Sequence, residues 1–235
     1  MKTIASRQNP LFKRIREAIR EHGREIVIEG PKQVADAIAG GWTPIVTVTR
    51  GVEMSAELFD SLAETRTPQG VIGLFERPRA TFADLLRRPE TIVVALDAVQ
   101  DPGNVGTIVR LAAAFDAAGV ALLPGCADAF GPKAIRASAG AILSVPVVGV
   151  TDRELLDCGL PLFAADAHGT SADPPARAAV LVFGSEGTGV SAELLGHSTP
   201  IAIATSDRID SLNVAASAAV LLSRSFAARS RLGDP

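Results

Sequence analysis

The chain has 235 residues, of which 47% are hydrophobic, and a formal net charge of −3. A chain of this length can bury a sizeable core, as one large domain or as two small ones. It has no run of about 18 uninterrupted apolar residues and no apolar N-terminal stretch of the signal-peptide kind, so the sequence predicts neither a membrane span nor secretion. We therefore expect a cytoplasmic protein.

Basic residues are concentrated at the N-terminal end. Residues 1–24 contain seven lysines and arginines against two glutamates, so the rest of the chain carries a net charge of −8. Such a run is typical either of a solvated helix face or of an arm that contacts phosphates. Four of these basic side chains fall on one predicted helix and are candidates for phosphate contacts: Lys13, Arg14, Arg16 and Arg20.

The cysteines and histidines do not have the spacing of metal ligands. Cys126, Cys158, His22, His168 and His197 are scattered, and two cysteines in a chain of this size do not make a disulfide framework. We interpret all five as structural or surface residues and expect no bound metal.

The first third of the chain has the pattern of a small α/β unit. Periodicity and turn residues predict helices at residues 10–21, 31–39 and 56–64, and strands at residues 24–30, 44–49 and 71–75. Arginine and proline residues at 77–79 and 87–89 then flank a short segment that could be a linker. We predict one domain over residues 1–78, a linker over residues 79–90 and a second domain over residues 91–235.

From Thr91 onwards, apolar runs alternate with helical patterns, which favours a parallel α/β sheet. The predicted strands cover residues 92–96, 120–123, 162–165, 180–183 and 201–204. After the first of them, an apolar helical stripe leaves Arg110 outside it, and the stripe consists of Ile108, Leu111, Ala112 and Phe115. The last helix has a similar stripe with small residues for close packing on the sheet or on another subunit: Leu212, Ala215, Ala216, Ala219 and Phe226.

Residues 101–110 (DPGNVGTIVR) follow a predicted buried strand and open a helix. The carboxyl edge of a parallel sheet is where α/β proteins bind ligands, so Asn104 and Arg110 are candidate functional residues. The alternative is an ordinary helix start with Asn104 as its N-cap and an idle, exposed Arg110.

Two later segments also place small and polar residues where the chain bends. Residues 183–189 (FGSEGTG) surround Glu186 with glycines, which serve either close approach to a ligand or a plain tight turn. Their GxxGxG spacing is not a dinucleotide fingerprint, and no GxxxxGK phosphate loop occurs. In residues 211–214 (SLNV), Ser211 either contributes to a site or, like Asp210, simply caps the last helix.

In this order, the three segments resemble the three motifs of the SpoU (TrmH-like) family of RNA ribose 2'-O-methyltransferases, in the SPOUT superfamily. Residues from about 92 to 229 resemble the catalytic domain, including residues 132–141 (PKAIRASAGA). Residues from about 6 to 75 resemble a substrate-binding domain of ribosomal-protein-like α/β fold, mainly through residues 28–30 and 69–71. The resemblance implies an α/β catalytic domain with a deep trefoil knot, bound S-adenosylmethionine and a homodimer.

The resemblance also assigns roles to residues of this chain. Asn104 and Arg110 match the first motif, Glu186 the second, and Ser211 and Asn213 the third, and together they are the predicted catalytic set. Backbone contacts to the methyl donor are expected at three matching positions: Gly184, Ile203 and Leu212. The chain departs from the family pattern at three positions, which puts donor affinity in question more than fold: Gly131, Ala204 and Asp207.

The implied reaction is attack by a ribose 2'-hydroxyl on the methyl group of S-adenosylmethionine. Arginine essentially never deprotonates in proteins, so we expect Arg110 to position a phosphate beside the target ribose and not to act as a base. The N-terminal domain favours rRNA over tRNA as the substrate. Two other classes stay open: an inactive RNA-binding protein of the same fold, and a nucleotide-dependent oxidoreductase, against which the missing dinucleotide fingerprint counts.

Overall fold

The computed structural model describes residues 3–21, 23–63, 68–88, 90–170, 173–206, 208–209 and 211–232. The chain forms two compact units. Unit 1 consists of residues 1–79 with residues 130–135, and unit 2 consists of residues 80–129 and 136–235. In the described part of the chain, no helix is long and apolar enough to cross a membrane.

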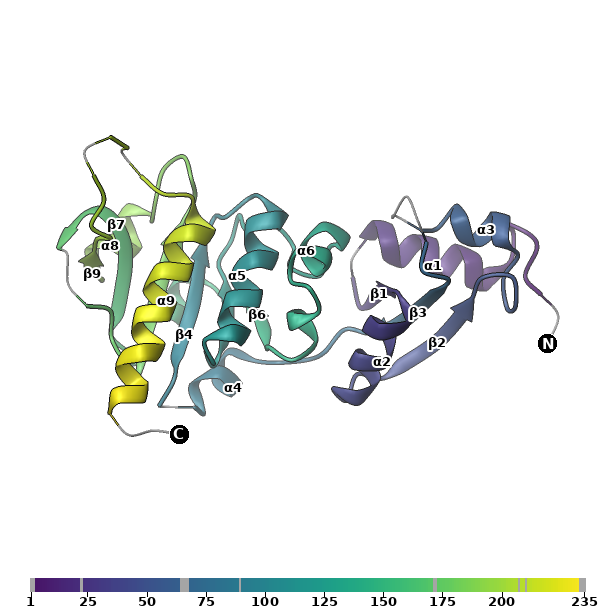
Figure 1. Ribbon diagram of the computed structural model, residues 1–235, viewed down its shortest axis with the longest axis horizontal. Helices are drawn as coiled ribbons and strands as arrows, with labels where there is room; N and C mark the ends of the chain where they lie inside the picture. Colours follow the sequence, from purple (N-terminus) through teal and green to yellow (C-terminus); the bar gives the residue numbers. More distant parts are fainter. Residues whose placement is uncertain are drawn as a thin grey trace. The chain divides into compact units, whose positions relative to one another are not determined.

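Unit 1 is built on a three-stranded antiparallel sheet of order β1-β3-β2 (Figure 1). Its elements are α1 (Pro10–Glu21), β1 (Glu25–Glu29), α2 (Pro31–Ala39), β2 (Pro44–Thr49), α3 (Ala56–Asp60) and β3 (Val71–Glu76). All six were predicted, but α3 was expected to reach residue 64, which lies outside the described residues. The helix ends at Asp60, and the Ser61 hydroxyl donates to the Leu58 carbonyl at 2.7 Å.

The sheet of unit 1 has helices on both faces, and successive residues of its central strand β3 face them alternately. Ile72 and Leu74 of β3 belong to a buried cluster with α1 and α3, to which α1 contributes Phe12 and Ile15. Gly73 lies on the opposite face, where a Cβ would come within 3.1 Å of Val34 in α2. The basic residues of α1 lie between its buried positions and are exposed.

Unit 2 contains a six-stranded parallel sheet of order β6-β5-β4-β8-β7-β9. Its strands are β4 (Ile92–Asp97), β5 (Gly119–Leu122), β6 (Val147–Gly149), β7 (Leu162–Thr170), β8 (Ala179–Gly184) and β9 (Thr199–Ile201). Its helices are α4 (Phe82–Leu86), α5 (Pro102–Ala114), α7 (Asp152–Leu156), α8 (Ala192–Gly196) and α9 (Val214–Arg231), and α6 (Pro132–Ala137) straddles the boundary between the two units.

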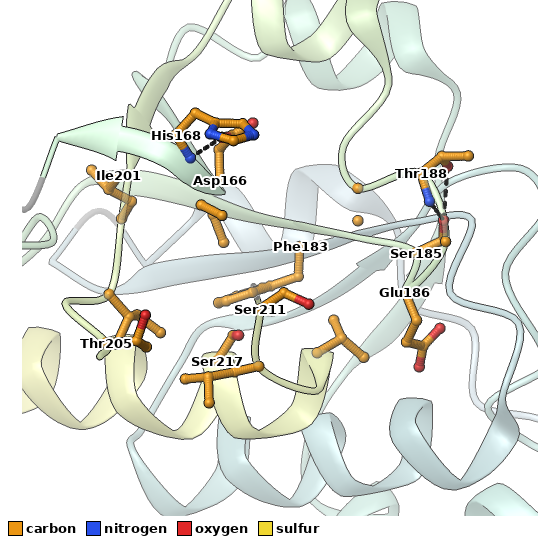
Figure 2. A pocket seen from close by; sticks show the side chains of 18 residues that line it. Asp166, His168, Phe183, Ser185, Glu186, Thr188, Ile201, Thr205, Ser211 and Ser217 are labelled. Carbon is orange, nitrogen blue, oxygen red and sulfur yellow. Dashed lines mark hydrogen bonds between the residues drawn. The ribbon is translucent and has the colours of Figure 1, made fainter. Parts of the chain in front are cut away.

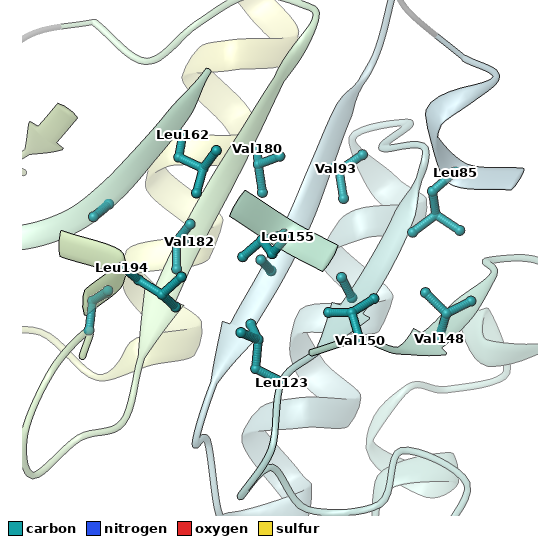
Figure 3. Close-up of a cluster of buried hydrophobic side chains, with 14 of the residues drawn as sticks. Leu85, Val93, Leu123, Val148, Val150, Leu155, Leu162, Val180, Val182 and Leu194 are labelled. Atoms are coloured by element: carbon teal, nitrogen blue, oxygen red, sulfur yellow. The ribbon is translucent and has the colours of Figure 1, made fainter. Parts of the chain in front are cut away.

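Both faces of this sheet are covered by helices. On one face, Leu85 of α4, Leu155 of α7 and Leu194 of α8 pack against alternate strand residues, including Val93 and Val182 (Figure 3). On the other face, α5 and α9 lie side by side (Figure 1). Strands β4 and β8 are buried along their whole length, as expected for strands covered on both sides.

Several elements of unit 2 differ from the sequence predictions. The short strand β6 was not predicted, and residues 82–86 of the predicted linker form α4, whose Leu85 is 1% exposed. The strand predicted at residues 201–204 ends at Ile201, and the chain beyond Ala202 runs along a cavity described below.

The last helix also differs from its predicted stripe. Its buried positions are Val214, Ala215, Ala218, Leu221, Leu222, Ser225 and Arg229. Ala216 and Phe226 of the predicted stripe are exposed. The helix begins at Val214 and not at Ser211. The predicted apolar stripe therefore began at Leu212, a residue outside the helix.

Candidate active site

The first two motifs meet because the strands that lead into them are neighbours. β4 and β8 pair in parallel, and Asp97 at the end of β4 lies opposite Gly184 at the end of β8. The Asp97 carboxylate is 7% exposed and accepts a 2.7 Å hydrogen bond from the Ser191 backbone N–H. This bond ties the far end of the second-motif loop back to β4.

The second-motif loop is closed by its own hydrogen bonds. Ser185 and Gly189 exchange backbone hydrogen bonds of 3.1 and 2.9 Å, and the Ser185 hydroxyl lies 2.9 Å from the Thr188 hydroxyl. A Cβ at Gly184 would lie 2.0–2.1 Å from backbone atoms of Gly189 and Val190. Only glycine fits there, because the loop folds directly against it. Glu186 is left exposed in this loop.

A chain of side-chain hydrogen bonds joins all three motifs. The side-chain NH2 group of Asn213 donates to the side-chain oxygen of Asn104 at 3.3 Å. The side-chain NH2 group of Asn104 in turn donates to the Glu186 carboxylate. The Asn213 oxygen also accepts from the backbone N–H groups of Ala215 and Ala216 at 2.9 and 3.3 Å. Asn213 is therefore the N-cap of α9 and, at the same time, part of this polar chain.

Beside this polar chain lies a cavity of about 390 Å³ between the ends of β7, β8 and β9 and the start of α9. Its wall combines buried apolar side chains with loop backbone and hydroxyl groups (Figure 2). The lining residues include Asp166, His168, Phe183, Gly184, Glu186, Ile201, Ile203, Thr205, Ser211, Leu212 and Ser217. A cavity of this size is in the range of small-molecule sites.

The charged side chains of the wall are mostly acidic. Asp166 and Glu186 line the cavity, and no lysine or arginine is among its described lining residues. The Asp166 carboxylate also accepts a 2.6 Å hydrogen bond from the His168 backbone N–H (Figure 2). The cavity is therefore suited to a ligand with a positive charge.

The predicted site residues fall into three groups. Gly184, Ile203, Leu212, Glu186 and Ser211 line the cavity. Asn104 and Asn213 do not line it but are hydrogen-bonded to each other and, through Asn104, to Glu186. Arg110 is exposed on α5, and no hydrogen bond or ion pair joins it to a described residue.

Both helix-cap alternatives from the sequence were wrong. Asp101 is the N-cap of α5, since its carboxylate accepts from the Gly103 N–H at 2.9 Å, so Asn104 is free to bond elsewhere. Asn213 and not Ser211 caps α9. Asp210, like Asp207, lies outside the described residues.

The sequence did not single out several residues of the wall, among them Asp166, His168, Phe183, Thr205 and Ser217. One signal was available. Asp166 follows directly after the predicted strand at residues 162–165, at the same sheet edge as the other motifs.

The basic residues of α1 belong to unit 1 and have local partners. Arg14 forms a bidentate pair with Glu25, which raises the pKa of Arg14 through its hydrogen bonds and its charge. Arg20 pairs with Glu21 at 2.9 Å, and the Arg16 guanidinium lies 5.7 Å from the centre of the Phe12 ring. Lys13 is exposed.

The Cys126 thiol and the possible metal ligands do not point to a further site. Cys126 donates to the Leu96 carbonyl at 3.1 Å, and burial raises its pKa, so the thiol is neutral near pH 7. Among the residues that the structure describes, no group of three or more His, Cys, Asp or Glu side chains could hold a metal ion.

Residues 91–223 match the SpoU rRNA Methylase family. The chain is 31% identical to the 23S rRNA (guanosine(2553)-2'-O)-methyltransferase RlmP of Bacillus subtilis, over 86% of this chain and 84% of that protein. It is 36% identical to the 23S rRNA (adenosine(1067)-2'-O)-methyltransferase of Streptomyces laurentii, over 77% and 70%. An AdoMet-bound rRNA methyltransferase from Sinorhizobium meliloti superposes with a TM-score of 0.85 at 28% identity, covering 97% of this chain and 98% of that one.

Proposed function

We propose, since the chain belongs to the SpoU rRNA Methylase family, that it transfers a methyl group from S-adenosylmethionine to a ribose 2'-hydroxyl of 23S-type rRNA. The observation that carries this proposal is the hydrogen-bond chain from Asn213 through Asn104 to Glu186, which brings three distant motifs to the rim of one cavity. The 2'-hydroxyl specificity and the rRNA substrate are supported by the names of the relatives in Bacillus and Streptomyces.

The cavity fits the proposed donor in size and in charge. Its Phe183, Ile201 and Leu212 side chains offer an apolar wall, and loop backbone near Gly184 offers hydrogen-bonding groups. The carboxylates of Asp166 and Glu186 suit a sulfonium cation. When bound, S-adenosylmethionine would supply an electrophilic methyl carbon.

The residues of the chain then have distinct tasks. Asn104 holds the Glu186 carboxylate at the cavity, so the negative charge is already in position before the donor binds. Arg110 stays charged and would bind the phosphate beside the target ribose with its planar fork, which aligns the 2'-oxygen and stabilises its developing negative charge. The cavity residues Gly184, Ile203 and Leu212 would hold the donor, and its methyl group would replace the proton of the ribose hydroxyl that Arg110 aligns.

Several finer features belong to the same proposal. They are the trefoil knot around the donor site, a ribosomal-protein-like fold for residues 1–78, a homodimer, and the predicted division into an RNA-binding domain and a catalytic domain, with α4 of the predicted linker packed in unit 2. Sedimentation of the purified protein tests the dimer. A species of one chain at micromolar concentration would contradict it.

The activity is tested with methyl-labelled S-adenosylmethionine and an unmodified 23S rRNA transcript. We expect label on ribose, recovered as an alkali-resistant dinucleotide, because a 2'-O-methyl group blocks cleavage of the adjacent phosphodiester. Label on a base, or on protein alone, would contradict the proposal. Binding of the donor and of RNA without any transfer would favour the inactive RNA-binding alternative.

A further inference from the structure

Besides the cavity of unit 2, the protein has a concave surface in unit 1, and this surface is remote in sequence from every motif of the methyltransferase family. It encloses about 500 Å³ at the ends of β1 and β3, and its charged lining residues are Arg24, Glu25, Glu76, Arg77 and Arg79. All of them belong to unit 1. We call this set, with Arg14, the arginine surface.

The strand register forces the arginines together. β1 and β3 pair antiparallel with Glu25 opposite Glu76, so Arg24 and Arg77 face each other one residue beyond the paired strands. The backbone N–H of Arg77 donates to the backbone carbonyl of Arg24 at 2.8 Å. Like charges directly opposite each other destabilise a sheet, so this arrangement has a cost in the free protein.

The nearby carboxylates do not cancel this positive charge. Glu25 is held by Arg14, whose Nε lies 3.1 and 3.0 Å from the two carboxylate oxygens. Apart from this pair, the surface contains three arginines and one carboxylate. Arg24 and Arg79 are exposed, and neither is joined by an ion pair to a residue within the described ranges.

Arg77 is held in place by an aromatic ring. Its guanidinium lies 4.2 Å from the ring centre of Phe130, a residue of the same unit. The stacking restricts the Arg77 side chain, so less side-chain entropy is lost when an anion binds to this surface.

We propose that the arginine surface binds the phosphate backbone of the RNA substrate, a step that rests on the proposed function. Guanidinium groups pair bidentately with phosphates, and a bound polyanion removes the repulsion between Arg24 and Arg77. The phosphate contacts of unit 1 are therefore centred on the ends of β1 and β3, and the α1 residues, of which Arg14 and Arg20 are already paired, extend that surface.

The test compares Arg24→Gln, Arg79→Gln and the double variant with a control, Arg153→Gln. Arg153 in α7 is also exposed, and its Nε lies 3.4 Å from the Asp157 carboxylate. Affinity for an unmodified 23S rRNA transcript is measured between 50 and 200 mM KCl, with thermal melting as a check of folding. Each lost phosphate contact should lower the log–log salt slope by about 0.7 to 0.9. We therefore expect the slope of the double variant to fall by the amount for two contacts and the slope of the control to stay unchanged.

Further arms keep this inference separate from the proposed function. Binding of S-adenosylmethionine should be unchanged in all variants, and Arg24→Lys should keep the wild-type slope. A folded double variant with the wild-type slope and affinity would overturn the proposal, as would equal losses in Arg153→Gln. If the wild-type protein binds RNA through this surface but transfers no methyl group, the proposed function fails and the RNA surface stands.

Discussion

The side-chain amide of Asn104 donates a hydrogen bond to the Glu186 carboxylate, 82 residues further along the chain. Asn104 lies in the first turn of α5, and Glu186 lies in the loop after β8. The pair forms because β4 and β8, the strands before these two segments, are neighbours in the sheet. A carboxylate at the rim of the cavity is thus oriented by a residue that does not line it.

Replacing Asn104 by alanine should lower kcat about 10- to 100-fold. A hydrogen bond to a charged group contributes about 1.5 to 3 kcal/mol, and Glu186 would lose the donor that holds it. Single-turnover methylation of RNA measures the effect. Thr107→Val on the same helix is the control, because the Thr107 hydroxyl donates to the Gly103 carbonyl of its own helix and bonds no other described residue. Equal rates for Asn104→Ala and wild type would contradict the proposed role.

Arg110→Ala should lose roughly 10²- to 10³-fold in transfer while S-adenosylmethionine still binds, because Arg110 is not among the residues that line the cavity. Calorimetric titration of the donor and a methylation assay separate the two activities. Arg153→Ala, at another exposed arginine of unit 2, should change neither. If donor binding and transfer fall together in Arg110→Ala, the assignment of Arg110 to the RNA side is wrong.

Gly184→Ala and Gly187→Ala form a matched pair in one loop. At Gly184 a Cβ would overlap backbone atoms of Gly189 and Val190, whereas at Gly187 it would meet nothing within 4 Å. We expect Gly184→Ala to abolish donor binding by displacing the loop, and Gly187→Ala to keep the wild-type melting temperature. Donor affinity and thermal melting check both. A Gly184→Ala protein with normal donor affinity would show that the loop is not part of the donor site.

Asp116→Asn should destabilise the protein by about 1 to 3 kcal/mol, because it weakens the ion pair of a buried arginine. The Asp116 carboxylate lies 2.9 Å from Arg229, which is 8% exposed, and 2.8 Å from Arg88. Urea unfolding measures the change. Asp157→Asn removes an exposed ion pair and should cost less than about 0.5 kcal/mol. Equal effects would mean that burial of Arg229 does not matter.

The capping box of α7 should make part of the stability pH-dependent. Glu154 accepts from the Thr151 N–H and hydroxyl, both at 2.8 Å, and these bonds lower its pKa below the usual 4.5. Since the folded pKa is the lower one, the contribution is present at neutral pH and is lost as the pH falls below about 4.5. Glu154→Ala should lower the melting temperature at pH 7, and by less at pH 3. Glu193→Ala in α8, whose N-cap makes no side-chain bond, should show no such pH dependence.

The sequence alone determined the elements of unit 1, most strands of unit 2 and the family. Helix Pro10–Glu21 and strands such as Ile92–Asp97 follow from short-range patterns of apolar residues, which need no knowledge of distant contacts. Gly184 was also recognisable, because a position that admits no side chain restricts the residue type directly. The short strand β6 and the five-residue helices α4, α7 and α8 escaped prediction, since one or two turns carry too little periodicity.

The tertiary structure decided which residues act together. A cap prediction uses only a few neighbouring residues, and by that measure Asn104 and Ser211 were reasonable caps. Their roles differ because Asp101 and Asn213 take the caps and the order of the sheet brings Asn104 next to Glu186. Likewise, only the register of β1 and β3 places Arg24 opposite Arg77. Local propensity is encoded in adjacent residues, whereas a site depends on strand order, register and loop closure, which are properties of the folded chain as a whole.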